Sequence, residues 1–344
     1  MREFIMNEGL PTLLFPFERG ILDVPQAGQR VLVLGAAGFR MPDESAADVV
    51  AVQDFRPDHL ALVRSGIRTV AEAGEGGFDL ALVLLSRHRR ENERLIGEAL
   101  ARVKPGGLIV AAGTKKDGAP SFAKRIGGVV PVAAHMSKHH GVVFWIVRPE
   151  EISTSVLEQL RPEPLFTPEG FETASGGFSE GRIDEGSRLL LECLPEKLVA
   201  SAGRVADFCA GWGYLAVEIA KQYEIAGVDL YEAHKRSLDA AERNFARMAP
   251  GKPARFFWHD LATEPVAERY DAIVMNPPFH QSRSAQPELG QAMIRVAAGA
   301  LKPGGRLFLV ANRGLPYEAV FKEHFADHGE IRRNDTYKVL WGRR

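Results

Sequence analysis

The sequence predicts an α/β protein with two tandem domains, each built on a mostly parallel sheet flanked by helices. Short apolar segments bounded by glycine and proline alternate with segments of helical periodicity, which is the pattern of parallel strands joined by crossover helices. This pattern occurs twice, and three segments of the first half recur in the same order in the second half. The repetition indicates a duplicated, Rossmann-like domain.

The second half shows the alternation most clearly. One helix is expected from Tyr214 to Gln222, and in the next helix Leu238, Ala241, Phe245 and Met248 share one face. The strands expected around them are Val205 to Cys209, Ile225 to Leu230, Arg255 to His259, Tyr270 to Met275, and Arg306 to Ala311 after the turn Lys302-Pro303-Gly304-Gly305.

The matching segments of the two halves begin with the same kinds of residue and end at the same kinds of turn. They are Arg30–Gly35 with Arg204–Cys209, Phe78–Val83 with Tyr270–Met275, and Val103–Val110 with Leu301–Phe308. Two unrelated α/β domains that share a Lys-Pro-Gly-Gly turn are the alternative.

We expect a first domain at 1–148, a proline-rich linker at 149–171 and a second domain at 172–344.

Bulk properties indicate a cytoplasmic globular protein. The 344 residues are 45% hydrophobic and 25% charged, and they contain neither a long apolar run nor a signal-peptide pattern after Met1. Cys193 and Cys209 make no disulfide framework, and the ten histidines have no metal spacing, so we expect no metal. The formal net charge of −1 argues against coating of nucleic acid by bulk charge. Local basic runs remain at 87–90 and 343–344.

The segment Asn276-Pro277-Pro278-Phe279 follows the buried strand that ends at Met275. Two prolines fix two φ angles and supply no N–H donors, so they hold the Asn276 side chain in one orientation. An amide oxygen and the backbone carbonyls of Asn276 and Pro277 are acceptors that suit a planar group bearing an NH2, on which Phe279 can stack. A plain strand-ending turn is the alternative.

Glycines and acids follow the other strands of this half. Cys209, Ala210, Gly211 and Gly213 form a loop between a strand and a helix, where glycines let a ligand approach the backbone. Asp207, just before the loop, would repel a pyrophosphate and attract an amine or sulfonium, which favours S-adenosylmethionine.

Two more acids are expected at strand ends. Asp229, beside Leu230, is expected to end the next strand and accept the ribose hydroxyls of a cofactor. Asp260 is expected to accept from an adenine amine, with Leu261 supplying a backbone donor. Each acid alone can equally be a helix cap or a surface turn.

The first half lacks these groups. Val33 stands at the position of Asp207, and Leu84-Leu85-Ser86-Arg87 stands at the position of the Asn-Pro-Pro-Phe segment. We therefore expect a non-catalytic first domain. In the second half, Gly176-Gly177-Phe178-Ser179 precedes Asp184 and a helix beginning near Arg188. This glycine loop can close over a ligand or be only the start of the domain with a helix cap.

From about Phe171 onward the chain resembles a class I S-adenosylmethionine-dependent methyltransferase. With the Asn-Pro-Pro-Phe segment and the degenerate first copy, the whole chain is similar to the ribosomal RNA guanine-N2 methyltransferases, first the small-subunit group and then the large-subunit group. The resemblance implies rRNA or the small subunit as substrate. It departs at Cys209, where many relatives have glycine.

The resemblance also implies roles for the site residues. Asp207, Cys209, Ala210, Gly211 and Gly213 would hold the methionine end of the cofactor, Asp229 and Leu230 its ribose, and Asp260 and Leu261 its adenine. Asn276, Pro277, Pro278 and Phe279 would hold the target amine and stack on the base. A base inside structured RNA has to be splayed out to reach such a site.

Other functions remain open at this point. Adenine N6 or a protein glutamine amide is an alternative target, because the same Asn-Pro-Pro turn suits either amine. A dinucleotide-dependent dehydrogenase is disfavoured by Asp207. A non-catalytic RNA-binding module is disfavoured by the intact motif of the second copy.

Overall fold

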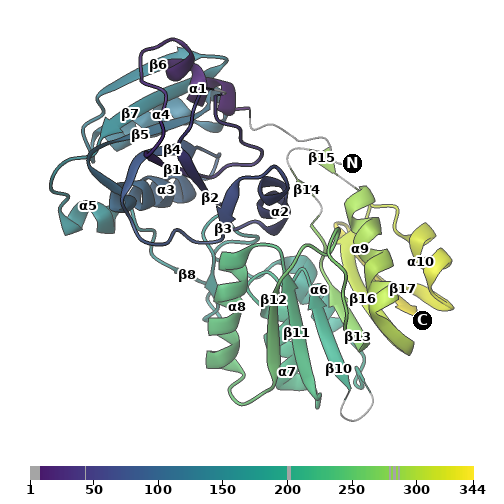
Figure 1. Cartoon of the computed structure of the whole chain (residues 1–344). Coiled ribbons are helices and arrows are strands. Elements are labelled where there is room, and N and C mark those ends of the chain that lie inside the picture. The colour runs from purple at the N-terminus through teal and green to yellow at the C-terminus, as the bar shows by residue number, and fades with distance from the viewer. Residues whose placement is uncertain (1–7, 43, 200–202, 279, 282–283, 286) are drawn as a thin grey trace. The chain divides into compact units, whose positions relative to one another are not determined.

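The computed structural model describes residues 8–42, 44–199, 203–278, 280–281, 284–285 and 287–344. The chain forms two compact units, Met1–Glu163 and Pro164–Arg344 (Figure 1). The main sheet of each unit has seven strands with helices packed against it, so the predicted class of two Rossmann-like α/β domains is confirmed. None of the helices in these ranges is long and apolar enough to cross a membrane.

The first unit contains the elements α1 Leu10–Glu18, β1 Arg30–Leu34, β2 Asp48–Val52, α2 Arg56–Arg64, β3 Arg68–Val70, β4 Phe78–Leu84, α3 Arg89–Arg102, β5 Val103–Thr114, the 3-10 turn η1 Lys115–Asp117, α4 Ala119–Gly127, β6 Ala134–Lys138, β7 Gly141–Val147 and α5 Thr154–Gln159. Its sheet has the strand order β3-β2-β1-β4-β5-β7-β6.

The second unit contains the elements β8 Leu165–Phe166, β9 Glu172–Thr173, α6 Glu185–Glu192, β10 Arg204–Phe208, α7 Tyr214–Gln222, β11 Gly227–Glu232, α8 Lys235–Met248, β12 Ala254–Trp258, β13 Tyr270–Met275, β14 His280–Gln281, β15 Ser284–Ala285, α9 Pro287–Ala300, β16 Leu301–Asn312, α10 Glu318–His324, β17 Asp327–Arg333 and β18 Tyr337–Arg343. Its main sheet has the order β12-β11-β10-β13-β16-β18-β17.

The two sheets have the same topology. In each, the first five strands of the order are parallel and the last two pair antiparallel. An aspartate on the fourth strand of each unit accepts from the backbone N–H that opens the first strand and from a lysine: Asp79 from Arg30 and Lys104, and Asp271 from Arg204 and Lys302, all at 2.8 Å. This shared contact supports the duplication inferred from the sequence.

The Lys-Pro-Gly-Gly turn differs from its prediction. In the second unit it lies inside β16 instead of before it, and the pairing register shifts between Tyr270 and Ala272 to accommodate the extra residues. Gly304 has φ +76° there, and Gly106 at the matching position of the first unit has φ +74°. A left-handed residue is therefore built into the bulge of both copies, which explains the glycine.

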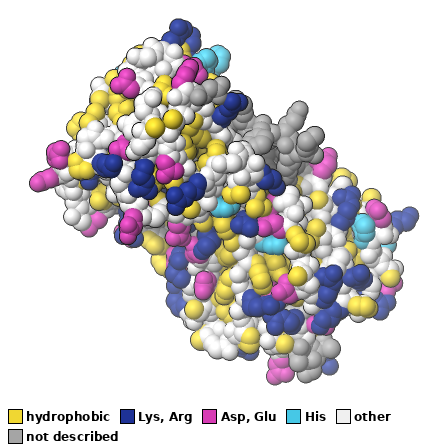
Figure 2. Space-filling model, in the orientation of Figure 1, with side chains coloured by type: hydrophobic (Ala, Val, Ile, Leu, Met, Phe, Trp, Pro, Cys, Tyr) yellow, Lys and Arg dark blue, Asp and Glu magenta, His cyan; other side chains and the backbone are white. Residues whose placement is uncertain are grey.

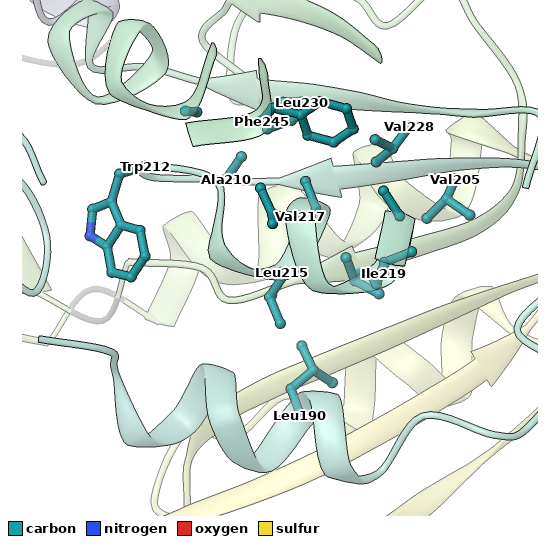
Figure 3. Close-up of a cluster of buried hydrophobic side chains, with 14 of the residues drawn as sticks. Leu190, Val205, Ala210, Trp212, Leu215, Val217, Ile219, Val228, Leu230 and Phe245 are labelled. Atoms are coloured by element: carbon teal, nitrogen blue, oxygen red, sulfur yellow. The ribbon is translucent and has the colours of Figure 1, made fainter. Parts of the chain in front are cut away.

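The strands of the second unit alternate their side chains between two apolar layers. On one face, Val205, Val228 and Leu230 pack with α6, α7 and α8. Figure 3 shows this cluster, in which Leu215 of α7 and Leu190 of α6 point toward each other. On the other face, Ala206, Phe208, Tyr231, Ile273 and Met275 pack with α9 and α10. Two such layers also enclose the sheet of the first unit.

The segment predicted as a linker, 149–171, is packed instead of extended. It contains α5, whose following residue Leu160 is buried in the core of the first unit. It also contains β8, which pairs with β9, and Phe171, which is buried in the core of the second unit. The boundary between the units lies between Glu163 and Pro164 because the apolar residues on either side belong to different cores.

Asp229 does not end its strand, so its predicted placement is wrong. β11 continues to Glu232, and the Asp229 side chain is fully buried within the sheet. It accepts hydrogen bonds from Arg204 at 2.7 Å, from Arg255 at 2.9 Å and from the Tyr270 hydroxyl at 2.7 Å. Burial alone would raise the pKa of this carboxyl, but these hydrogen bonds outweigh it and lower the pKa. Asp229 is therefore a structural anion that joins β10, β11, β12 and β13.

We predict that Asp229→Asn lowers the free energy of unfolding by about 2–3 kcal/mol, because it removes the charge from a buried acceptor of hydrogen bonds from three side chains. The two arginines that donate to it are partly solvated, which limits the size of this loss. Since the folded pKa is lowered, the wild-type carboxylate stabilises the fold above its ordinary pKa of 3.8, and this stabilisation is lost as the pH falls through the lower folded value.

Urea unfolding at pH 7 measures the effect. Glu330→Gln is the matched control because it breaks an exposed pair with Arg333 and should change the free energy by less than about 0.5 kcal/mol. Equal midpoints for the two variants would contradict the structural role of Asp229.

Candidate active site

The carboxyl ends of β10, β11 and β13 lie side by side because these strands are parallel and adjacent. Loops that follow such strand ends form the ligand crevice of open α/β sheets. A small pocket, open to solvent, lies at this edge in the second unit. Its lining residues come from these loops and from α6 and α7: Phe178, Asp184, Ser187, Cys209, Ala210, Gly211, Trp212, Tyr214, Leu215 and Asn276.

The predicted cofactor loop does border this pocket. Cys209, Ala210 and Gly211 line it, and Gly211 has φ +56° with open space where a Cβ would stand. Gly213 has φ +86° and caps α7, and a Cβ on it would lie 3.0 Å from the Ala241 Cβ. The first glycine leaves room for a ligand, and the second lets α7 approach α8 closely.

Cys209 adopts the left-handed backbone conformation, with φ +61°. Its Sγ lies 3.6 Å from the Met293 Sδ, on the α9 side of the sheet. Burial raises the pKa of this thiol, and the negative charges of Glu232 and Asp207 raise it further. Cys209 is therefore a neutral, packed thiol and not a nucleophile.

Asp207 lies beneath the loop and not among the residues that line the pocket. Its Oδ2 accepts from the Ala216 N–H at 3.0 Å, which satisfies the first turn of α7. Its Oδ1 is buried without a hydrogen-bond partner. Burial raises the pKa of this carboxyl to about 8; the Ala216 N–H opposes the rise, and the charge of Glu232 adds to it.

Glu232 occupies the strand end that the sequence assigned to Asp229. Its Oε2 accepts from the Gly211 N–H at 2.8 Å, and its Oε1 accepts from the His234 N–H at 2.8 Å. It is therefore the carboxylate that ties the end of β11 to the glycine loop. The sequence contained the signal, an acid just before α8, but the strand was expected to end at Leu230. Leu230 itself faces the α7–α8 core.

Asp260 follows β12 and is 3% exposed. Its Oδ1 accepts from the Ala262 N–H at 3.0 Å, and its Oδ2 accepts from the Thr263 hydroxyl at 2.6 Å, so the carboxylate organises its own turn. The Leu261 side chain is buried against the other face of the sheet. Neither residue is among those that line the pocket. The contacts of Asp260 are those of an acid that caps its own turn, which was the alternative interpretation of the sequence.

Asn276 has the most constrained side chain of the pocket. Its Nδ2 donates to Asp184 Oδ2 at 3.0 Å and to Ser187 Oγ at 2.8 Å. Its Oδ1 is buried and has no hydrogen-bond partner among the described residues. The side chain that lines the pocket therefore keeps an unpartnered acceptor, while both N–H bonds are held by α6.

The two prolines of the Asn-Pro-Pro-Phe segment come directly after Asn276. Pro277 is buried and Pro278 is half-buried, directly after the end of β13. Phe279, which the sequence predicts as a stacking ring, lies outside the described residues.

The glycine loop before α6 also reaches the pocket. The Trp212 Nε1 donates to the Phe178 carbonyl at 3.1 Å, and Phe178 is 52% exposed. Asp184 caps α6 by accepting from the Ser187 N–H at 2.8 Å, so the helix begins at Glu185, three residues before its predicted start. The sequence placed Asp184 and Ser187 near the start of a helix and predicted no contact between them and Asn276. These contacts could not be predicted, because Asp184 and Ser187 lie 92 and 89 residues from Asn276 in the sequence.

The described part of the chain contains no cluster of three or more His, Cys, Asp or Glu side chains that could hold a metal ion. The polar side chains among the lining residues include the carboxylate of Asp184, the hydroxyls of Ser187 and Tyr214 and the amide of Asn276, and none of the described residues that line the pocket is basic. This set suits an uncharged or cationic ligand better than a phosphorylated one.

Several relatives of this chain, and a solved structure similar to it, are named as methyltransferases. The ribosomal RNA small subunit methyltransferase C of Shewanella halifaxensis is 29% identical over 325 residues, which are 90% of this chain and 93% of that protein. Its counterpart in Hahella chejuensis is 29% identical over 78% of this chain and 79% of its own length. A solved structure described as T. thermophilus 16S rRNA N2 G1207 methyltransferase (RsmC) in complex with AdoMet and guanosine has 27% identity and a TM-score of 0.77, covering 93% of this chain and 89% of that one.

The family model of the methyltransferase small domain matches residues 169–341, half of the chain and nearly all of the second unit. The resemblance seen in the sequence is thereby confirmed at the level of the family. This protein belongs to the methyltransferase small domain family.

Proposed function

We propose that this protein is an S-adenosylmethionine-dependent methyltransferase that methylates the exocyclic N2 amine of a guanine in 16S ribosomal RNA. The observation that carries the proposal is the Asn276 Oδ1, a buried acceptor without a partner among the described residues, on a side chain that lines the pocket together with the glycine loop. The T. thermophilus enzyme, similar over 93% of this chain, binds AdoMet and guanosine. A substrate of this kind places the activity in the cytoplasm.

The second unit has groups that fit the cofactor. Gly211 leaves open space at the loop, Glu232 holds a carboxylate at the end of β11, and Asp207 keeps an oxygen without a partner beneath the loop. Carboxylates match the ammonium and ribose hydroxyls of S-adenosylmethionine and would oppose a pyrophosphate. When bound, the cofactor supplies an electrophilic methyl group on a sulfonium.

The chain's own contribution to the reaction is orientation. Asn276 Oδ1 accepts from the target NH2 and aligns the nitrogen with the methyl carbon, and such positioning is worth several kcal/mol. The nitrogen forms its bond to carbon as the carbon–sulfur bond breaks. The positive charge passes to nitrogen, which then loses a proton to solvent, so no strong base is required before the transfer.

The first unit is proposed to contact RNA without catalysing the reaction. Val33 is buried where the second unit has Asp207, and Leu84 and Leu85 are buried where it has the Asn-Pro motif. Arg87 and Arg89 follow as exposed cations at the same strand end. Figure 2 shows basic and acidic side chains interspersed on the visible face, which fits recognition of a specific folded target by local patches.

Labelled cofactor incubated with naked 16S rRNA, with small subunits and with large subunits tests the function. We expect label in N2-methylguanosine from small-subunit RNA. Label in N6-methyladenosine or in protein glutamine would establish another amine as the target. Binding of RNA with no methylated product in any arm would indicate a non-catalytic module.

We predict that Glu232→Gln weakens cofactor binding by about 1.5–3 kcal/mol, because it removes the charge from an acceptor at the ribose position. Isothermal titration with S-adenosylmethionine measures the change. Glu242→Gln on the exposed face of α8 is the control and should bind normally. If both variants are folded, and Asp229→Asn loses cofactor binding while Glu232→Gln keeps it, then Asp229 and not Glu232 contacts the ribose.

Asp207 is expected to release its proton when the cofactor binds. With a pKa of about 8 it is largely protonated at pH 7, and a cationic ligand beside the carboxyl favours the ionised form. Below about pH 8 the carboxyl of the free protein holds its proton, and this proton has to be released when the cofactor binds. The attraction between Asp207 and the cofactor therefore contributes less to binding as the pH falls through neutrality, and contributes fully at higher pH.

Titration calorimetry at pH 7 in buffers of different ionisation enthalpy counts the protons. Wild type should release up to about one proton more than Asp207→Asn, and this comparison cancels the titration of the cofactor itself. Asp327→Asn, at an exposed ion pair with Arg343, should match wild type. Equal proton release by wild type and Asp207→Asn would exclude contact between Asp207 and the cofactor's charge.

A further inference from the structure

The first turn of α6 holds the Asn276 side chain from behind. The two hydrogens of the Asn276 amide nitrogen have two acceptors within hydrogen-bond distance, Asp184 Oδ2 at 3.0 Å and Ser187 Oγ at 2.8 Å. Asn276 and Ser187 are both buried, with 8% of each residue exposed. These contacts connect segments that lie 92 and 89 residues apart in the sequence.

This arrangement fixes which end of the amide faces the pocket. A rotated amide would put its carbonyl oxygen against the Asp184 carboxylate, and two acceptors in contact repel each other. The Ser187 hydroxyl could donate to the rotated oxygen, so the acceptor-only carboxylate of Asp184 fixes the orientation, and Ser187 adds a second hydrogen bond to it. The Oδ1 therefore stays turned away from Asp184, and it has no hydrogen-bond partner among the described residues.

The support for Asn276 is itself rigid. Asp184 is held by the Ser187 N–H at 2.8 Å, as the N-cap of α6. Leu189 and Leu190 anchor the helix in the apolar core of the second unit. Gly186 lets the helix approach Tyr337 closely, because a Cβ there would lie 3.1 Å from the tyrosine ring.

We propose that Asp184 and Ser187 are positioning residues that keep Asn276 as a hydrogen-bond acceptor toward the substrate, and that this orientation selects a base edge that carries an NH2 over one that carries an oxo group or hydrogen. The proposal rests on the proposed function, since it concerns the target amine at the same pocket. An acceptor oxygen gains a partner from guanine N2 and none from hypoxanthine, which lacks that amine. The selectivity of the site thus depends on α6 as well as on the Asn-Pro-Pro turn.

The first test is kinetic and uses small subunits as substrate. Ser187→Ala and Asp184→Asn should each lower kcat by roughly tenfold or more, whereas the Kd for S-adenosylmethionine stays within about twofold of wild type. Ser187→Ala removes one of the two hydrogen bonds that hold the amide, and Asp184→Asn also lets the amide populate both orientations. Ser187→Thr keeps the hydroxyl and should restore most of the rate. Glu185→Gln is the matched control, since it removes a charge from the same helical turn at an exposed position.

The second test measures selectivity in the same variants. Guanosine should inhibit the wild-type enzyme more strongly than inosine, and Asp184→Asn should lose most of this difference. A variant that has become slow only through loss of structure would bind the cofactor less well and would keep the preference between the nucleosides. An unchanged kcat and an unchanged preference in both variants would overturn the proposal.

A third measurement separates this proposal from the proposed function. The side-chain NH2 signal of Asn276, labelled with ¹⁵N and identified by its loss in Asn276→Asp, should exchange slowly with solvent in wild type and faster in Ser187→Ala. This readout needs no substrate. Fast exchange in wild type would overturn the positioning role even if the enzyme methylates guanine, and slow exchange without methylation of any rRNA would reject the proposed function alone.

Discussion

The parallel pairing of β10 with β11 and with β13 is the constraint on which the site depends. It sets the carboxyl ends of three strands side by side, so that the glycine loop, Glu232 and Asn276 meet although they lie far apart in the sequence. Buried polar groups at such an edge need partners. Glu232 receives the Gly211 N–H, and Asp207 receives the N–H of Ala216. Among the described residues, the Asn276 Oδ1 and the second oxygen of Asp207 receive none, and these two unpartnered atoms are the basis of the proposed ligand contacts.

Both copies of the domain satisfy the same folding requirements, but they differ in the polar groups at their strand ends. Each unit has an aspartate, Asp79 or Asp271, that accepts hydrogen bonds from a lysine and from the first residue of the first strand. Each unit also has a left-handed glycine in the bulge of the sheet. In the first unit the counterpart of the Asn276 turn is closed off within the protein: the Asn92 side chain accepts from the Ser86 N–H at 2.9 Å and donates to the Ser86 carbonyl at 2.7 Å. The fold is therefore independent of these polar groups, since both units form the same sheet with different residues at the strand ends.

The sequence predicted the fold and the Asn276 turn because both are local patterns: alternating periodicity, glycine turns and a proline pair after an apolar strand. It could not choose between the two acids of β11. Asp229 and Glu232 stand three residues apart, and which one reaches the strand end depends on a boundary that periodicity locates only to within a few residues. The decisive contacts of Asp229 come from Arg204 and Arg255, on neighbouring strands, and only the folded sheet brings them together. The partners of Asn276 escaped prediction for the same reason.

Cys209 shows how the site uses a conformation that the fold imposes. The residue after the first strand has a positive φ in both units, +71° at Gly35 and +61° at Cys209, so the strand-to-loop turn itself requires this geometry. Glycine adopts it freely, as in the first unit, whereas a residue with a Cβ is strained by about 1–2 kcal/mol. A Cβ at Gly35 would lie 2.6 Å from the Leu84 carbonyl oxygen, so the first unit has no space for a side chain there. The second unit has that space, and the cysteine fills it by packing its sulfur against Met293 beneath the pocket. The strain at Cys209 is thus offset by contact with α9, and the loop that borders the pocket is supported by a side chain that the first unit, with Gly35 at this position, does not have.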